Sequence, residues 1–240
     1  SDATFSDLTN PSRRGNIVQM IRETYRISDT LREAEVAGMS NMLDYQTGKA
    51  SRRWKNQLEF TILDGTVASG SSGVARTMAG IEATVTSHYT ARLSGTSLSE
   101  TELNSMVYDV AQDVSMDDVF DMLVLPLQLR QKASTFTAGS TKFTDASDKR
   151  LTRPVAVYES DFNVMRIFAH KDVRSAVATP GPTIFGLKED KWKLAYFRRP
   201  KNVPLAKVGS SERGMIEGEV TLEFLAERAN ARRSGYNQTG

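Results

Sequence analysis

The clearest pattern of hydrophobic and polar positions in the chain is helical and lies between Ser40 and Asp64. Its core-side positions recur every three or four residues, the spacing that stacks side chains along one side of an α-helix. These positions are Leu43, Thr47, Ala50, Trp54, Leu58 and Ile62. The opposite side is polar and mostly basic, with Lys49, Arg52, Arg53, Lys55, Asn56 and Glu59. We therefore predict a long surface helix over residues 40–64, with Ser40 as its N-cap and with Leu43, Trp54, Leu58 and Ile62 in its core.

A second helix is predicted near residue 100, because Ser99 and Glu102 have the spacing of a capping box and Leu98 and Leu103 that of a hydrophobic staple. The apolar run 122–125 predicts a buried strand, and Pro126 is suited to open a short helix through Lys132. Further strands are expected over 155–159 and 164–168, as a hairpin, and over 183–187 and 192–198.

The longest predicted strand covers 215–227. Apolar residues alternate there with a mostly acidic set, which is typical of a strand with one side on the core. The apolar positions are Ile216, Val220, Leu222 and Phe224, and the others are Glu217, Glu219, Thr221 and Glu223. We expect the apolar side to pack on the long helix around Trp54. Helices and strands together predict an α+β fold.

Residues 16–28 also alternate, but neither side is cleanly apolar. Ile17, Ile21 and Ile27 share one side with Glu23, and Arg22 and Arg26 lie on the other. Two interpretations remain open: an edge strand, or an arm that pairs with a neighbouring molecule. The polar and basic residues from Asn230 onward are expected to form a tail outside the core.

Composition adds exclusions. The 240 residues have a formal net charge of +2, no cysteine and two histidines. This charge is too small to indicate a dedicated nucleic-acid-binding protein, and no apolar run is long enough to span a membrane. Gly65–Ser72 imitates a phosphate-binding loop, but Ser71 stands where that loop needs lysine. Scattered pairs such as Asp117 and Asp118 do not make a catalytic group. We therefore expect no enzyme activity and no catalytic, cofactor or metal site.

Five segments carry a resemblance to a known family. They are Ala3-Thr-Phe-Ser-Asp-Leu-Thr-Asn-Pro-Ser-Arg-Arg-Gly15, Asp145-Ala-Ser-Asp-Lys149, Val157-Tyr-Glu-Ser-Asp-Phe162, Trp192-Lys-Leu-Ala-Tyr196 and Pro204-Leu-Ala-Lys207. In this order they resemble segments of a major capsid (major head) protein family of tailed bacteriophages, over essentially the whole chain.

The resemblance implies the Hong-Kong-97-type capsid fold, with a spine helix at 40–64. Residues 1–28 would be the returning strand of the extended loop, and 66–150 the axial domain. Residues 29–65 and 151–240 would form the peripheral domain, with a hairpin tip at 207–214 that meets a local threefold axis. Family members also carry an N-terminal arm and an outgoing strand before the residues that match Ala3. On that basis strand 16–28 is expected to lack its pairing partner in this chain.

The resemblance also implies a function and a set of partners. The chain would be a structural subunit of the icosahedral or prolate head around a double-stranded DNA genome, and an encapsulin-like compartment shell is the alternative. Its partners would be copies of itself in hexamers and pentamers, a portal, scaffold or decoration proteins, and nearby DNA, but no membrane. The subunit would assemble in the host bacterial cytoplasm and end in the virion. The expected intersubunit contacts are Arg13, Arg14, Arg22, Arg26, Lys207, Glu212 and Arg213.

Overall fold

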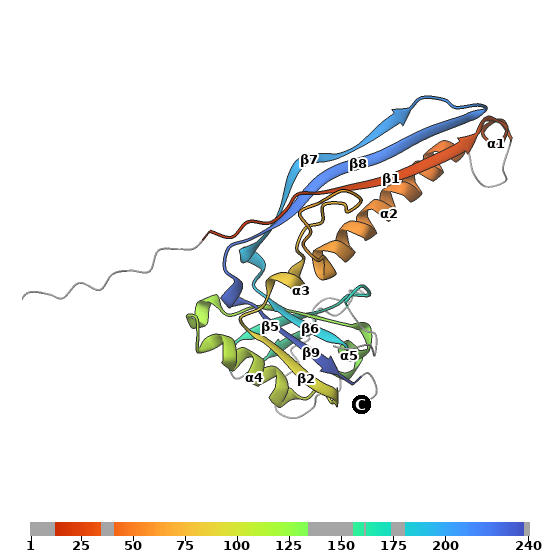
Figure 1. The fold of residues 1–240 in the computed structure, drawn as a ribbon. Helices are drawn as coiled ribbons and strands as arrows, with labels where there is room; N and C mark the ends of the chain where they lie inside the picture. The colour runs from red at the N-terminus through yellow and green to blue at the C-terminus, as the bar shows by residue number, and fades with distance from the viewer. Residues whose placement is uncertain (1–12, 35–40, 134–155, 161, 174–180, 238–240) are drawn as a thin grey trace, which may run out of the picture.

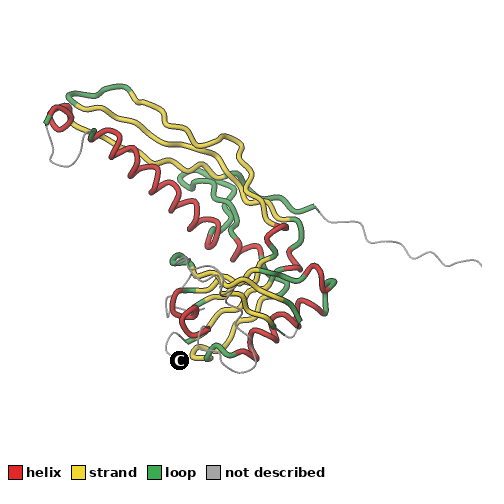
Figure 2. Tube along the Cα trace, turned by 180° about the vertical axis from the view of Figure 1, so that it is seen from behind, coloured by secondary structure: helices red, strands yellow, loops and turns green. Residues whose placement is uncertain are grey.

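The computed structural model describes residues 13–34, 41–133, 156–160, 162–173 and 181–237. Two sheets organise these residues into a long lobe and a compact lobe, which are seen from opposite sides in Figure 1 and Figure 2. The long lobe has the antiparallel strands β1 (Gln19–Ser28), β8 (Ser211–Phe224) and β7 (Trp192–Leu205), in that order across the sheet. The helix α2 (Met42–Asp64) runs along one face of this sheet.

The compact lobe is built on a mixed six-stranded sheet with the order β2-β9-β6-β3-β5-β4. Its strands are β2 (Tyr89–Thr96), β9 (Ala231–Tyr236), β6 (Thr183–Leu187), β3 (Met122–Leu125), β5 (Val164–Ala169) and β4 (Ala156–Glu159). The helices α4 (Glu100–Ala111) and α5 (Leu127–Ala133) belong to the same lobe. The remaining short helices are α1 (Asp29–Glu33), α3 (Ile81–Thr84) and the 3-10 turns Met116–Asp118, Glu189–Lys191 and Glu227–Ala229.

The long helix is present where the periodicity predicts it, but its first turn differs. The N-cap is Asn41, whose side chain accepts hydrogen bonds from the Leu43 and Asp44 N–H groups, whereas the predicted cap Ser40 lies outside the described residues. The helix ends at Asp64, and its C-cap Gly65 cannot be replaced without a shift, because a Cβ there would come within 2.4 Å of the Thr61 carbonyl and 2.8 Å of the Met78 carbonyl.

Burial along α2 follows the predicted core side in the middle of the helix and departs from it at the ends. Trp54 and Leu58 are buried, whereas Leu43 and Ile62 are only partly buried. In the last turn Leu63 joins the core instead, in the same cluster as Met78. The reason is tertiary packing. The chain leaves the helix at Gly65 and returns at residues 78–81, where the Gly80 N–H donates to the Gly65 carbonyl, and these residues cover a different side of the last helical turn.

The structure corrects the prediction for the N-terminal strand. β1 pairs with β8 over its whole length, from Gln19 opposite Val220 to Ser28 opposite Ser211. Ile21 and Ile27 are buried on the α2 side, and the Trp54 indole N–H donates to the Ile21 carbonyl at 3.0 Å. The expectation that strand 16–28 lacks a partner in this chain is therefore wrong: β1 has one side on α2 and the other on solvent.

The compact lobe confirms the local signals around residue 100. The Ser99 hydroxyl accepts from the Glu102 N–H at the start of α4, and Leu98 and Leu103 are both buried. The predicted hairpin is formed by β4 and β5, which pair antiparallel. β3 is buried between β5 and β6, as its apolar run indicates.

The expected polar tail is wrong, because most of it is a central strand of the compact lobe. β9 lies between β2 and β6, and Arg233 is only 2% exposed. The Arg233 guanidinium donates to Glu102, Ser105 and Asp109 on α4, at 2.6–3.0 Å. A buried arginine is tolerated when carboxylates neutralise it, and hydropathy along the chain does not detect such partners.

The predicted division of the chain into domains also needs correction. Residues 151–240 do not stay in one sheet, since β7 and β8 join β1 while β4, β5, β6 and β9 join β2 and β3. The hydrophobic pattern of a strand indicates which side is buried, but it does not indicate the partner strand.

Candidate intersubunit surface

The three-stranded sheet has one side that faces away from α2, and we call this side the outer sheet face. Directly opposed residues of antiparallel strands point to the same side, so the register defines its members. They are Val18, Met20, Arg22, Thr24 and Arg26 before and along β1; Arg213, Met215, Glu217, Glu219, Thr221 and Glu223 on β8; and Lys193, Ala195, Arg198, Lys201, Val203 and Leu205 on β7.

The middle of the outer sheet face is an ion-pair network. Glu217 pairs with Arg22 and with Arg198, each at 3.2 Å, and Arg198 also reaches Glu219 at 2.8 Å. The hydrogen bond to Glu219 raises the pKa of Arg198 further above its usual value. The predicted contact residue Arg22 is thus satisfied within its own chain.

The other predicted contact residues divide into two groups. Arg14 pairs with Glu227 at 3.2 Å, Lys207 with Asp29 at 3.3 Å, and Glu212 with Arg32 at 2.9 Å, all within the chain. Arg13, Arg26 and Arg213 have no ion pair with any described residue. The tip itself is the turn between β7 and β8, which matches the predicted hairpin at 207–214. Whether any of these residues meets a neighbour stays a prediction.

Arg26 and Arg213 form an unusual pair on the outer sheet face near this tip. They are directly opposite each other in the β1–β8 register. Like charges in this position destabilise a sheet. The Arg213 Nε is inaccessible to solvent and has no hydrogen-bond partner within the described part of the chain. The pair is therefore a local excess of positive charge at the far end of the long lobe.

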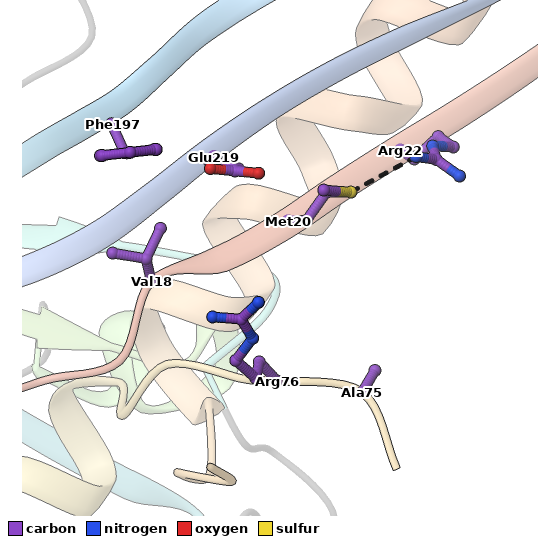
Figure 3. A pocket seen from close by; sticks show the side chains of 7 residues that line it. All are labelled: Val18, Met20, Arg22, Ala75, Arg76, Phe197 and Glu219. Carbon is purple, nitrogen blue, oxygen red and sulfur yellow. Dashed lines mark hydrogen bonds between the residues drawn. The ribbon is translucent and has the colours of Figure 1, made fainter. Parts of the chain in front are cut away.

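A pocket of about 590 Å³ lies on the outer sheet face next to the ion-pair network (Figure 3). Its apolar lining comes from Val18, Met20 and Phe197, and its charged lining from Arg22, Glu219 and Arg76. Phe197 is 75% exposed and lies where the β7–β8 register shifts. Sequence reasoning missed this pocket, because a β-bulge that turns an aromatic side chain outward has no periodic signature.

A polar cluster around Glu227 connects segments of the two lobes. The buried Glu227 carboxylate accepts hydrogen bonds from the Thr86 and Ser87 N–H groups at 2.5 and 2.6 Å, and Arg14 donates to it. Burial on its own raises the pKa of Glu227, but these hydrogen bonds outweigh burial and lower it. Asn16 adds a pair of hydrogen bonds with the backbone of Ala79. Hydrogen bonds therefore hold the segment that precedes β1 at the junction of the two lobes.

Two groups of described residues resemble ligand sites. Glu59, His170 and Asp172 form a possible metal-ligand group, but His170 Nδ1 already accepts from the Asp172 N–H at 3.1 Å and Nε2 is 3.9 Å from Glu59. The loop that imitates a phosphate-binding motif is a tight turn, with a bridge between Ser71 and Val74. Across the described ranges, no helix has the length and apolar character required to cross a membrane.

Comparison with solved structures identifies the fold. The capsid of an empty GTA particle matches with a TM-score of 0.62 and 8% identity, over 99% of this chain and 81% of that one. The capsid of Myoviridae phage XM1 matches with a TM-score of 0.58 and 11% identity, over 91% and 73%. The holo-SrpI encapsulin complex from Synechococcus elongatus matches with a TM-score of 0.59 and 8% identity, over 93% and 76%. At such low identity these matches establish the Hong-Kong-97-type fold alone.

Sequence comparison is more specific about the family. No curated protein sequence matches the chain. The family of the SU10 major capsid protein matches residues 1–237, which is nearly the whole length. The spine helix, the three-stranded sheet beside it and the compact lobe are thus those of a coat subunit, and the chain belongs to the SU10 major capsid protein family.

Proposed function

We propose that this chain forms the hexamers and pentamers of the icosahedral or prolate head of a tailed bacteriophage, around a double-stranded DNA genome. The observation that carries the proposal is the family match over residues 1–237. The fold agrees with it, because a long lobe attached to a compact lobe presents extended surfaces that identical copies can share by symmetry. Subunits would assemble in the host bacterial cytoplasm, with a portal and with scaffold or decoration proteins as partners.

We further propose the outer sheet face near the tip as a contact between subunits. Arg26 and Arg213 are the strongest candidates, because a carboxylate from a neighbour would remove their mutual repulsion. Arg13 is a second candidate, since it is exposed and comes directly before Arg14, which is held by its hydrogen bond to Glu227. Arg14, Arg22, Lys207 and Glu212 are weaker candidates, because each already has an ion-pair partner in its own chain.

An encapsulin-like compartment is the second candidate function, supported by the fold match to the SrpI encapsulin complex. The contents of the particle distinguish the two. Shells isolated from the producing bacterium should be imaged by electron microscopy and assayed for nuclease-protected DNA and for enclosed protein. Heads with double-stranded DNA are expected. Shells that hold a folded protein cargo and no DNA would overturn the proposal in favour of the compartment.

A further inference from the structure

The solvent side of α2 carries four cations within two turns: Lys49, Arg52, Arg53 and Lys55. We call these four residues the basic strip. Arg52, Arg53 and Lys55 are exposed and Lys49 is partly exposed, with its ammonium 5.0 Å from the centre of the Tyr45 ring. None of the four forms an ion pair with a described residue.

The basic strip contrasts with the middle of the outer sheet face but not with the whole lobe, because Lys193, Arg199 and Lys201 on β7 also lack an ion pair with any described residue. On the opposite side of the same lobe Arg22 and Arg198 are held by Glu217 and Glu219. The nearest carboxylates along α2 form no ion pair with these four cations: Asp44 accepts from Asn41, and Glu59, four residues after Lys55, lies 3.9 Å from His170 Nε2. Acidic partners therefore neutralise the arginines in the middle of the outer sheet face, whereas the cations of the basic strip have no acidic partner among the described residues.

The spacing of the basic strip suits a polyanion with regularly spaced charges. Lys49 and Lys55 are six residues apart, which is about 9 Å along a helix. Duplex DNA presents one phosphate per about 1.7 Å of its axis when both strands are counted. Side chains of arginine and lysine can each reach a separate phosphate, and the planar guanidinium binds phosphate through two N–H groups. Such contacts require no particular base sequence.

A protein partner fits the basic strip less well. Contacts between proteins depend on buried aromatic or aliphatic anchors at their centre. The centre of this helix face is polar, with Arg52, Arg53 and Asn56, and its exposed aromatic residues Tyr45 and Phe60 lie toward the two ends.

We propose that the basic strip binds the phosphate backbone of double-stranded DNA inside the shell. The α2 side of the long lobe would then face the genome, and the outer sheet face would point away from it. This inference rests on the proposed function, because only a subunit of a DNA-filled shell would meet DNA on one wall.

The test compares two triple variants of equal charge change. Arg52→Gln, Arg53→Gln and Lys55→Gln remove three charges of the basic strip. Lys193→Gln, Arg199→Gln and Lys201→Gln remove three exposed charges of β7, which also lack an ion pair with any described residue. Capsomers of each variant are titrated with a fluorescein-labelled 30-base-pair DNA duplex at several salt concentrations, and binding is followed by fluorescence anisotropy.

Loss of the basic strip is expected to lower the slope of log affinity against log salt by about 2–3 for each strip that touches DNA, because each phosphate contact contributes about 0.9. At 0.1 M salt the affinity should fall by about 100-fold, and the β7 variant should bind nearly as wild type. Equal weakening in both variants would show an effect of net charge only and would overturn the inference. Unchanged binding in the basic-strip variant would also overturn it.

Shell formation by the same proteins separates this inference from the function on which it rests. Both variants and the wild type should form shells visible by electron microscopy. Failure of the wild type to form any shell would count against the proposed function. Normal shells with DNA binding that ignores the basic strip would count against this inference alone.

Discussion

At the scale of single residues, two buried charges show how this subunit is held together. Arg233 connects β9 to α4 through Glu102, Ser105 and Asp109. Glu227 connects the segment after β8 to Thr86 and Ser87, and to Arg14 before β1. Each charge is surrounded by donors or acceptors from distant segments, because a buried charge without such partners would be costly.

Glu227 should make the stability of the subunit dependent on pH. The native pKa of this carboxyl is lower than its usual value, so its contribution is fully present above the unfolded value of about 4.3 and is lost as pH falls through the native pKa. Glu227→Gln should cost about 2 kcal/mol at pH 7, the scale of hydrogen bonds to a charged group. Urea unfolding from pH 7 to pH 3 measures this cost.

The difference between wild type and Glu227→Gln should narrow below pH 4, because the wild-type carboxyl then becomes neutral as well. Glu223→Gln is the matched control, since Glu223 lies near the end of β8, four residues before Glu227, is exposed and forms no ion pair with a described residue. Its cost should be near zero at every pH. A constant difference between Glu227→Gln and wild type over the whole range would contradict the proposed role of the charge.

At the scale of elements, β1 is an integral strand of the subunit. It is paired with β8 at ten positions and packs on α2 through Ile21 and Ile27. Trp54 contributes both apolar burial and a hydrogen bond to the β1 backbone. The helix, β1 and β8 therefore share one core, which also contains Ile216 and Val220.

Amide hydrogen exchange in dissociated subunits should show that β1 is an integral strand of the single subunit. The amides of residues 19–28 that donate to β8 should be protected to about the same degree as those of 216–224, because both strands belong to one cooperative unit. The alternate amides of β1 point away from β8 and have no partner among the described strands of this sheet, since β1 is an edge strand. The exposed segment 66–77 should exchange quickly and serves as the internal reference. Rapid exchange of β1 beside a protected β8 would mean that β1 is ordered only by assembly.

At the scale of the whole molecule, the long lobe has two different sides, the side covered by α2 and the outer sheet face. α2 covers one face of the three-stranded sheet, and the outer sheet face is left open, with a pocket near Phe197 and the arginine pair near the tip. In the isolated subunit the outer sheet face is destabilised near the tip, because Arg26 and Arg213 repel each other. A carboxylate that binds both arginines would remove this repulsion.

Arg213→Glu should separate subunit stability from assembly. The new carboxylate would face Arg26 and replace a repulsion by an attraction, which should stabilise the isolated subunit by about 0.2–1 kcal/mol. If a carboxylate of a neighbour normally binds this pair, the same change should reduce shell yield by about tenfold, since like charges across an interface are strongly unfavourable. Thermal melting of subunits and shell counts by electron microscopy report the two effects.

Glu189→Gln is the control for the arginine pair. It removes only the exposed pair with Arg166 in the compact lobe, worth about 0–1 kcal/mol, and should leave shell yield unchanged. Normal assembly of Arg213→Glu would exclude the arginine pair from the contact between subunits.

Local sequence by itself determined the elements of this protein. The spine helix, the capping box at Ser99 and the alternation along β8 are set by neighbours three, four or two positions apart, so they can be read without knowing the fold. The tertiary structure alone decided the partners: β1 with β8, β9 in the centre of the compact sheet, and Arg233 inside its ring of acceptors. Strand pairing and charge neutralisation join residues that are far apart in the chain, and no local pattern records which distant segment supplies the other half.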